Sequence, residues 1–135
     1  CDINLRQLGV TVDTVVPLLD AATVLKLNDE ELPVLARLFG LHGDIEEQLK
    51  QLIAQFDLTL LALTRGAQGS VLMTQTECVD TPKGKDIDIV DTIGAGDAFT
   101  AALIVSTLEG RDLQAVSDNA NALAAFVCTQ AGAMP

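Results

Sequence analysis

Short apolar runs alternate along this 135-residue chain with longer segments that have the period of an amphipathic helix. The apolar runs predict strands at residues 1–5, 24–27, 58–64, 70–74, 77–80 and 86–90. The helical segments are residues 14–21, 30–39, 45–56, 96–108 and 113–129. Strands separated by helices of about 10 to 15 residues imply an α/β fold with parallel pairing. Residues 58–90 contain several strands and no helix, so we expect an antiparallel extension at one edge of the sheet.

Charge and composition exclude several classes of partner. The formal net charge is -11, from 19 acidic and 8 dispersed basic residues, which argues against nucleic acid because its binding requires neutralising backbone phosphates. The longest strongly apolar run, residues 98–108, is far short of the about 20 residues that span a bilayer. Cys1, Cys78 and Cys128 show no Cys-x-x-Cys spacing, which favours neither a disulfide framework nor a zinc site. We expect a cytoplasmic protein without a nucleic-acid or membrane partner.

A glycine loop joins the last predicted strand to the helix at residues 96–108. The loop runs from Asp91 to Asp97 and reads DTIGAGD. Gly94 and Gly96 allow a tight turn, and the first amides of the following helix have no carbonyl partner within it, which favours an anion. Asp97 beside an anion is unfavourable unless it has a chemical task, such as accepting a proton from an attacking hydroxyl. The alternative is that Asp97 merely caps the helix.

Residues 91–99, DTIGAGDAF, resemble the DTxGAGDxF signature of the ribokinase-like (PfkB) carbohydrate kinases. The resemblance implies a three-layer ribokinase-like α/β fold with a mostly parallel sheet, and transfer of phosphate from ATP to a sugar hydroxyl. Asp97 would be the base, and the amides of the loop containing Gly94, Ala95 and Gly96 would hold the developing phosphate charge. No Walker A pattern is present, which excludes a P-loop enzyme.

The same resemblance bears on the extent of the domain. Family members are about twice as long as this chain, and the glycine loop lies in their C-terminal half. Residues 1–135 would therefore be the C-terminal nucleotide-binding and catalytic part of the kinase domain, without the N-terminal sugar-binding half and lid. On this view the 135 residues alone are inactive or nearly so.

Asn28 and Glu31 have two explanations that the sequence leaves open. They follow a predicted strand and have the spacing of a capping box, which satisfies helix-terminal donors without any further function. The spacing also matches the family's Asn-x-x-Glu motif, which organises magnesium-bound waters near the transferred phosphate. Both residues offer the hard oxygen ligands that Mg²⁺ prefers.

Nucleotide contacts are implied at two further places. The turn after residues 58–64 matches the family's Thr-x-Gly-x-x-Gly pattern along the nucleotide, which assigns Thr64, Gly66 and Gly69 to this role. A plain hairpin turn is the alternative, and both can hold. Asn121, in a helix rich in alanine, corresponds to a polar position facing adenine in relatives. A solvated or cap-like Asn is at least as good an explanation.

The first segment places Asp2, Asn4 and Arg6 on one side of a strand by its period of two. This pattern resembles the Asp-x-Asn-x-Arg strand of fructokinase-like members, which lies near the sugar and phosphates, and it makes Arg6 the preferred contact. A solvated edge strand is the competing explanation. Asp91 and the Ile93 carbonyl resemble part of a monovalent cation site in many members, and the use of K⁺ by this chain is left open.

The sequence thus predicts a fructokinase-like enzyme that uses ATP and Mg²⁺, with a small sugar as its other ligand. Two other hypotheses remain, a nucleotide-binding or regulatory module without transferase activity, and an α/β domain whose motif match is accidental. The identity of the sugar and the choice between monomer and homodimer are not decided by the sequence.

Overall fold

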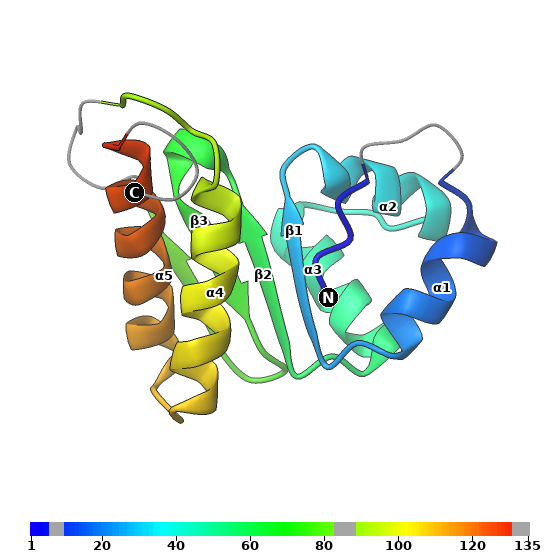
Figure 1. Ribbon diagram of the computed structural model, residues 1–135. Helices are drawn as coiled ribbons and strands as arrows, with labels where there is room; N and C mark the ends of the chain where they lie inside the picture. The colour runs from blue at the N-terminus through cyan, green and yellow to red at the C-terminus, as the bar shows by residue number, and fades with distance from the viewer. Residues whose placement is uncertain (6–9, 83–88, 131–135) are drawn as a thin grey trace. The chain divides into compact units, whose positions relative to one another are not determined.

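The computed structural model describes residues 1–5, 10–82 and 89–130 (Figure 1). The chain divides into two compact units. The first unit consists of Cys1–Gly66 with Leu72–Cys78, and the second consists of Ala67–Val71 with Val79–Pro135. Each unit is considered by itself below.

The described residues form five α-helices, one 3-10 turn and four strands. In chain order the elements are α1 (Val12–Asp20), β1 (Val24–Asn28), α2 (Glu31–Phe39), α3 (Ile45–Phe56), β2 (Leu60–Thr64), the 3-10 turn η1 (Gly66–Gln68), β3 (Ser70–Met73), β4 (Cys78–Thr81), α4 (Ala95–Leu108) and α5 (Leu113–Cys128). The described helices begin and end within two residues of the predicted ones, and α3 matches its prediction at both ends.

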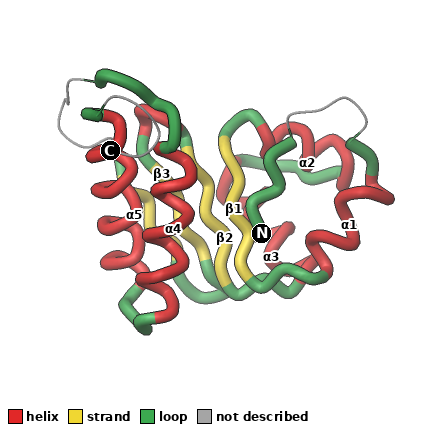
Figure 2. The backbone as a smooth tube through the Cα atoms, viewed as in Figure 1, coloured by secondary structure: helices red, strands yellow, loops and turns green. Residues whose placement is uncertain are grey.

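The four described strands form a mixed sheet in the order β1-β2-β3-β4 (Figure 2). β1 and β2 are parallel, with Val24 opposite Leu60 and Asn28 opposite Thr64, and the crossover between them contains α2 and α3. The connections from β2 to β3 and from β3 to β4 are far shorter than the dozen or more residues that a parallel crossover needs. These later strands are therefore antiparallel neighbours, as the absence of a helix between residues 58 and 90 predicted.

Leucines make the core of the first unit. α2 packs against β1 and α3 packs against β2. The two strands and the two helices contribute side chains with at most 1% of their area exposed, namely Leu25, Leu27, Leu35, Leu49, Leu52, Leu61 and Leu63. At the ends of α2 and α3, the rings of Phe39 and Phe56 meet edge to face with their centroids 5.2 Å apart. This packing holds the last residues of β1 and β2 side by side.

In the second unit α4 and α5 lie side by side along their lengths (Figure 1). Phe99 and Leu103 of α4 are buried, as are Val116, Ala120 and Val127 of α5. A small residue such as Ala120, which is fully buried, allows two helices to approach closely. The packing fixes the start of α4, where the glycine loop enters the helix.

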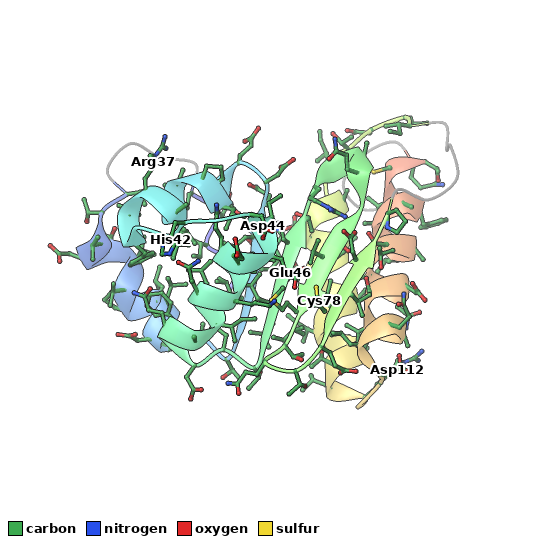
Figure 3. The ribbon with its side chains drawn as sticks, turned by 180° about the vertical axis from the view of Figure 1, so that it is seen from behind. Arg37, His42, Asp44, Glu46, Cys78 and Asp112 are labelled. Atoms are coloured by element: carbon green, nitrogen blue, oxygen red, sulfur yellow. The ribbon has the colours of Figure 1, made fainter. Side chains whose placement is uncertain are left out.

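Aspartates begin two of the helices, and Figure 3 labels both of them, Asp44 and Asp112. Asp44 accepts a hydrogen bond from the Glu47 amide at 2.9 Å, and the Glu47 carboxylate accepts one from the Asp44 amide at 2.9 Å, which completes a capping box before α3. Asp112 accepts from the Ala115 amide at 2.8 Å before α5. These caps therefore explain why α3 and α5 begin at the residues that the helical periodicity predicted.

Two predicted strands differ from the structure. In residues 1–5 only Asp2 pairs as a strand residue, in a parallel bridge to Lys26, because Asn4 has a φ of 48° and leaves the extended conformation. The prediction that Asp2, Asn4 and Arg6 lie on one side of a strand is therefore wrong at Asn4. Arg6 lies outside the described residues.

The second difference is at residues 86–90, of which residues 86–88 lie outside the described part of the chain. Ile89 and Val90 belong to no strand and are more than half exposed. The amides of Val90 and Asp91 donate instead to the Cys128 carbonyl at the end of α5, at 2.8 and 3.2 Å. An apolar run thus enters the glycine loop without being a strand at these two positions.

Gly69 shows a close backbone approach that only glycine permits. Its φ is +91°, and a Cβ at this position would overlap the carbonyl oxygen of Thr81 and the backbone of Pro82. Gly66 also has a positive φ, of +55°, but a Cβ there would meet nothing within 4 Å. We expect Gly69→Ala to lower the free energy of unfolding by about 3 kcal/mol or more, because strain and overlap add.

The matched variant Gly66→Ala should cost only about 1–2 kcal/mol, the price of a left-handed conformation alone. Urea unfolding of the two variants measures the difference. Equal losses at the two positions would contradict the close approach at Gly69.

None of the helices in the described ranges is both long enough and apolar enough to cross a membrane.

Candidate functional site

The glycine loop enters α4 through two successive turns. Asp91 Oδ1 accepts a hydrogen bond from the Ile93 amide at 2.9 Å, and the Ala95 amide donates to the Thr92 carbonyl at 3.3 Å. Gly94 then takes a left-handed conformation, with φ 84° and ψ -7°, and is the N-cap of α4. A residue with a side chain would be strained there. The left-handed Gly94 is therefore part of the tight turn that the glycine pattern predicted.

Asp97 is the third residue of α4 and is exposed. The helix begins at Gly94 without a side-chain cap, and the Asp97 carboxylate accepts no hydrogen bond from a residue that the structure describes. The amides of Gly96 and Asp97 belong to the first turn, whose donors have no acceptor within the helix. This end of α4 presents an exposed carboxylate next to amides that attract an anion, and the helix dipole stabilises negative charge there.

Asn28 and Glu31 form a reciprocal set of hydrogen bonds at the end of β1. Asn28 Oδ1 accepts from the amides of Glu30 and Glu31 at 3.0 and 2.9 Å, and Glu31 Oε2 accepts from the Asn28 amide at 2.8 Å. Glu31 Oε1 accepts from the Leu5 amide at 3.0 Å. Glu31 is only 5% exposed. The reciprocal bonds of a capping box are therefore present just before α2, whose N-cap residue Glu30 makes no side-chain cap bond. Glu31 also fastens the N-terminal segment to the start of α2.

Lys26 and Asp2 were not singled out as a pair from the sequence. Lys26 lies in the middle of β1 and is 8% exposed, and its Nζ is 3.1 Å from Asp2 Oδ2 and 3.3 Å from Oδ1. The Lys26 amide donates to the Cys1 carbonyl at 2.8 Å. A buried ammonium requires such a partner. The polar pattern of the first segment thus serves at least in part to pair a lysine within β1.

Thr64 lies at the end of β2, directly opposite Asn28 in the register of the sheet. Its hydroxyl donates to the Leu27 carbonyl at 3.2 Å. Ligands of parallel α/β sheets bind outside the carboxyl ends of the strands, where Asn28 and Thr64 both lie. Gly66 opens the 3-10 turn that follows. The structure therefore brings Asn28, Glu31, Thr64 and Gly66 to one edge of the first unit.

Asn121 lies in a buried polar network of the second unit. Its Nδ2 donates to Ser70 Oγ at 2.7 Å and to the Ser117 carbonyl at 2.8 Å, and lies 3.3 Å from Ser117 Oγ. The hydroxyls of Ser117 and Thr81 are 2.6 Å apart. Ser70 and Ser117 are fully buried. The sequence analysis missed these hydroxyls, although the i, i+4 spacing of Ser117 and Asn121 was available as a signal.

The predicted site residues therefore fall into two groups. Asn28, Glu31, Thr64 and Gly66 belong to the first unit. The second unit contains the remaining described ones, namely Gly69, Asp91, Ile93, Gly94, Ala95, Gly96, Asp97 and Asn121. Gly69 permits the close approach to β4, and Gly94 forms the turn before α4.

A cavity of about 530 Å³ in the first unit contains none of the predicted site residues. It lies against α3 and the β3–β4 turn, and Figure 3 labels two of its lining residues, Glu46 and Cys78. Lys50 also lines it, and the hydrogen bond from Lys50 to Glu46, at 2.7 Å, raises the pKa of this exposed lysine. Within the described ranges no three His, Cys, Asp or Glu residues gather as a metal cluster would require.

Comparison with known proteins places the chain in a family. Residues 2–135 match the model of the pfkB family carbohydrate kinases. The chain is 36% identical over 115 residues to an ATP-dependent ribose-1-phosphate kinase of Halopiger xanaduensis, and 36% identical over 134 residues to a ribokinase of Arabidopsis thaliana. These matches cover 85% and 92% of this chain but 36% and 34% of the relatives. The chain thus spans about a third of the length of these two relatives.

A solved structure agrees with this result. The fructokinase double mutant of Vibrio cholerae O395, with fructose, ADP and potassium bound, is 34% identical, with a TM-score of 0.71. The match covers 90% of this chain and 39% of the fructokinase. The mixed sheet and the glycine loop before α4 define a ribokinase-like α/β protein, as the resemblance implied. The chain belongs to the PfkB family of carbohydrate kinases.

Proposed function

We propose that this chain is the catalytic and nucleotide-binding part of an ATP-dependent kinase that phosphorylates a sugar hydroxyl. The observation that carries the proposal is the start of α4. There an exposed Asp97 carboxylate, which accepts no bond from a described residue, adjoins first-turn amides behind a left-handed Gly94. Membership in the PfkB family supports the same reaction. The combination suits a reaction in which a hydroxyl loses a proton while phosphate charge develops nearby.

In the proposed reaction Asp97 takes the proton of the acceptor hydroxyl as its oxygen attacks the γ-phosphorus of ATP. The bond from that phosphorus to the bridging oxygen breaks, and ADP leaves. The amides of the loop from Gly94 to Asp97 stabilise the charge on the transferred phosphoryl group. Thr64, Gly66, Gly69 and Asn121 would lie along the nucleotide, and Arg6, outside the described residues, would contact the sugar or its phosphate.

The oxygen atoms of Asn28 and Glu31 are the groups proposed to hold Mg²⁺, and their hydrogen bonds limit how they could hold the ion. Each Glu31 oxygen already accepts one backbone amide, and the residue is only 5% exposed, which disfavours direct coordination of the ion. A carboxylate has further lone pairs that can accept from water, so the pair fits a role in which it orients waters of the ion. Bound Mg²⁺ would neutralise phosphate charge. Asp91 and the Ile93 carbonyl are the oxygen donors proposed for K⁺, supported by the potassium-bound Vibrio cholerae fructokinase.

Fructose is our leading acceptor, because Asp2, Asn4 and Arg6 follow the fructokinase-like pattern. Ribose and ribose 1-phosphate are the alternatives, since relatives of similar identity are named for them. Consumption of ATP by the full-length gene product that carries these residues, measured with a panel of these sugars and nucleosides, tests the proposal. Turnover with one acceptor supports it and names the substrate. No turnover with any acceptor, despite ATP binding, favours a nucleotide-binding module instead.

The same assay applied to residues 1–135 alone tests the extent of the domain. We expect nucleotide binding with little or no turnover, because the sugar pocket and lid are proposed to lie outside these residues. Turnover at an ordinary kinase rate by the 135 residues would overturn that part of the proposal.

A further inference from the structure

The orientation of the Asn121 amide is determined by its partners. The Ser117 carbonyl can only accept a hydrogen bond, so the atom of Asn121 that lies 2.8 Å from it must be the nitrogen. The same nitrogen lies 2.7 Å from Ser70 Oγ. Its two hydrogens are thereby used within the protein, and the amide cannot turn over without placing its oxygen against a carbonyl oxygen.

The remaining polar atom of this side chain is therefore an acceptor. Asn121 Oδ1 accepts no hydrogen bond from any residue in the described part of the chain, and the side chain is half-buried. Half-buried Ala124 and Ala125 follow on α5, three and four positions along, and lie on the same face as Asn121 one turn further on. One turn beyond Asn121, this face of the helix therefore carries two methyl groups and no further hydrogen-bonding side chain at those two positions.

The hydroxyl groups of Ser70 and Ser117, which lie next to the Asn121 amide nitrogen, are themselves fixed in place. Ser70 and Ser117 are fully buried, and Thr81 Oγ1 lies 2.6 Å from Ser117 Oγ. Ser70 begins β3, Thr81 ends β4, and Ser117 and Asn121 are one turn apart on α5. Buried hydroxyls need partners, so this arrangement resists rearrangement and keeps the amide nitrogen pointing inward.

We propose that Ser70 and Ser117, supported by Thr81, are positioning residues for the Asn121 amide. They present Asn121 Oδ1 as a hydrogen-bond acceptor that selects adenine over a purine without the 6-amino group. This inference rests on the proposed function, in which Asn121 lies along the nucleotide. A 6-amino group donates to Oδ1, whereas a base without that donor leaves the oxygen unpaired. The preference for adenine arises because the bonds from Asn121 Nδ2 to Ser70 and Ser117 leave Oδ1 as the atom that faces the base.

The test compares binding of ATP with that of purine riboside triphosphate, which carries hydrogen in place of the 6-amino group, both with Mg²⁺ and measured by calorimetry on the full-length gene product. We expect ATP to bind about tenfold more tightly, the effect of one hydrogen bond to a partly buried acceptor. Asn121→Leu should bring the ratio of the two dissociation constants close to one. The double variant Ser70→Ala with Ser117→Ala should reduce the ratio to below threefold, because one backbone bond alone no longer holds the amide.

Ser106→Ala is the matched control, since Ser106 is also buried in the second unit but bonds Asn119 rather than Asn121. It should keep the tenfold ratio. A general loss of stability weakens both nucleotides equally, so only a positioning role changes the ratio. Equal binding of the two nucleotides by the unmodified protein overturns this inference and leaves the proposed function standing. An unchanged ratio in the double variant overturns the positioning role, and absence of binding by either nucleotide overturns the proposed function and this inference with it.

Discussion

Asp97→Asn is expected to slow phosphotransfer by orders of magnitude while leaving ATP binding intact. Asparagine keeps the size of the side chain but cannot accept the proton of the acceptor hydroxyl. General-base catalysis contributes about 10²–10⁴-fold, so kcat should fall by that factor with the preferred sugar. The dissociation constant for ATP should change by less than about threefold, because the loop amides remain in place and the lost charge had opposed the phosphates.

The structure supports the assumption that this variant folds. The Asp97 carboxylate bonds no described residue and is exposed, so its loss removes only a favourable interaction with the helix dipole, of about 0.3–1 kcal/mol. Asp118→Asn is the matched control, because Asp118 is an exposed aspartate of α5 whose carboxylate bonds Gln114 at 2.9 Å. It removes the same charge and should keep full turnover. Equal turnover in Asp97→Asn and the unmodified protein would remove Asp97 as the base.

Glu31→Ala is expected to destabilise the first unit more than any other single change at the predicted site residues of that unit. The two carboxylate oxygens accept the amides of Leu5 and Asn28, and alanine would leave both donors without their partner in a region where Glu31 itself is 5% exposed. Each unsatisfied donor costs about 1–3 kcal/mol, so the two together predict a loss of about 2–6 kcal/mol in the free energy of unfolding. Glu31→Gln keeps one acceptor oxygen and should lose about half as much.

Glu30→Gln provides the control for this series. Glu30 is the exposed neighbour whose side chain makes no capping bond, and its substitution should stay within about 0.5 kcal/mol. Urea unfolding measures all three variants. A loss for Glu31→Ala no larger than that for Glu30→Gln would show that the capping bonds contribute nothing to stability.

A second measurement on Glu31→Gln separates the two explanations for the Asn28–Glu31 pair. If the carboxylate also orients waters of Mg²⁺, the Mg²⁺ concentration needed for half-maximal turnover should rise, in addition to the loss of stability. If the pair only caps α2, that concentration should not change. Both roles can hold, because the carboxylate oxygens keep lone pairs beyond those used by the amides.

Prediction from sequence worked best where the cause is local. Asp44 and Asp112 begin α3 and α5 through bonds to amides three residues away, and such short-range patterns are visible in the chain. Gly94 takes its left-handed conformation where the loop pattern required a tight turn. The prediction was wrong at Asn4 and at Ile89 and Val90, where apolar alternation suggested strands. Strand pairing depends on a neighbouring strand, and the sequence pattern does not reveal whether one is in register.

The sequence by itself determined the alternation of strands and helices, the helix starts and the glycine loop, and through that loop the family. Only the tertiary structure decided which groups each site residue contacts. Glu31 bonds the Leu5 amide 26 residues away, and Asn121 bonds Ser70 51 residues away. These partners depend on sheet register and on the packing of α5, which no local preference specifies. Short-range hydrogen bonds follow from residue spacing, whereas long-range ones exist only after the apolar core has brought distant segments together.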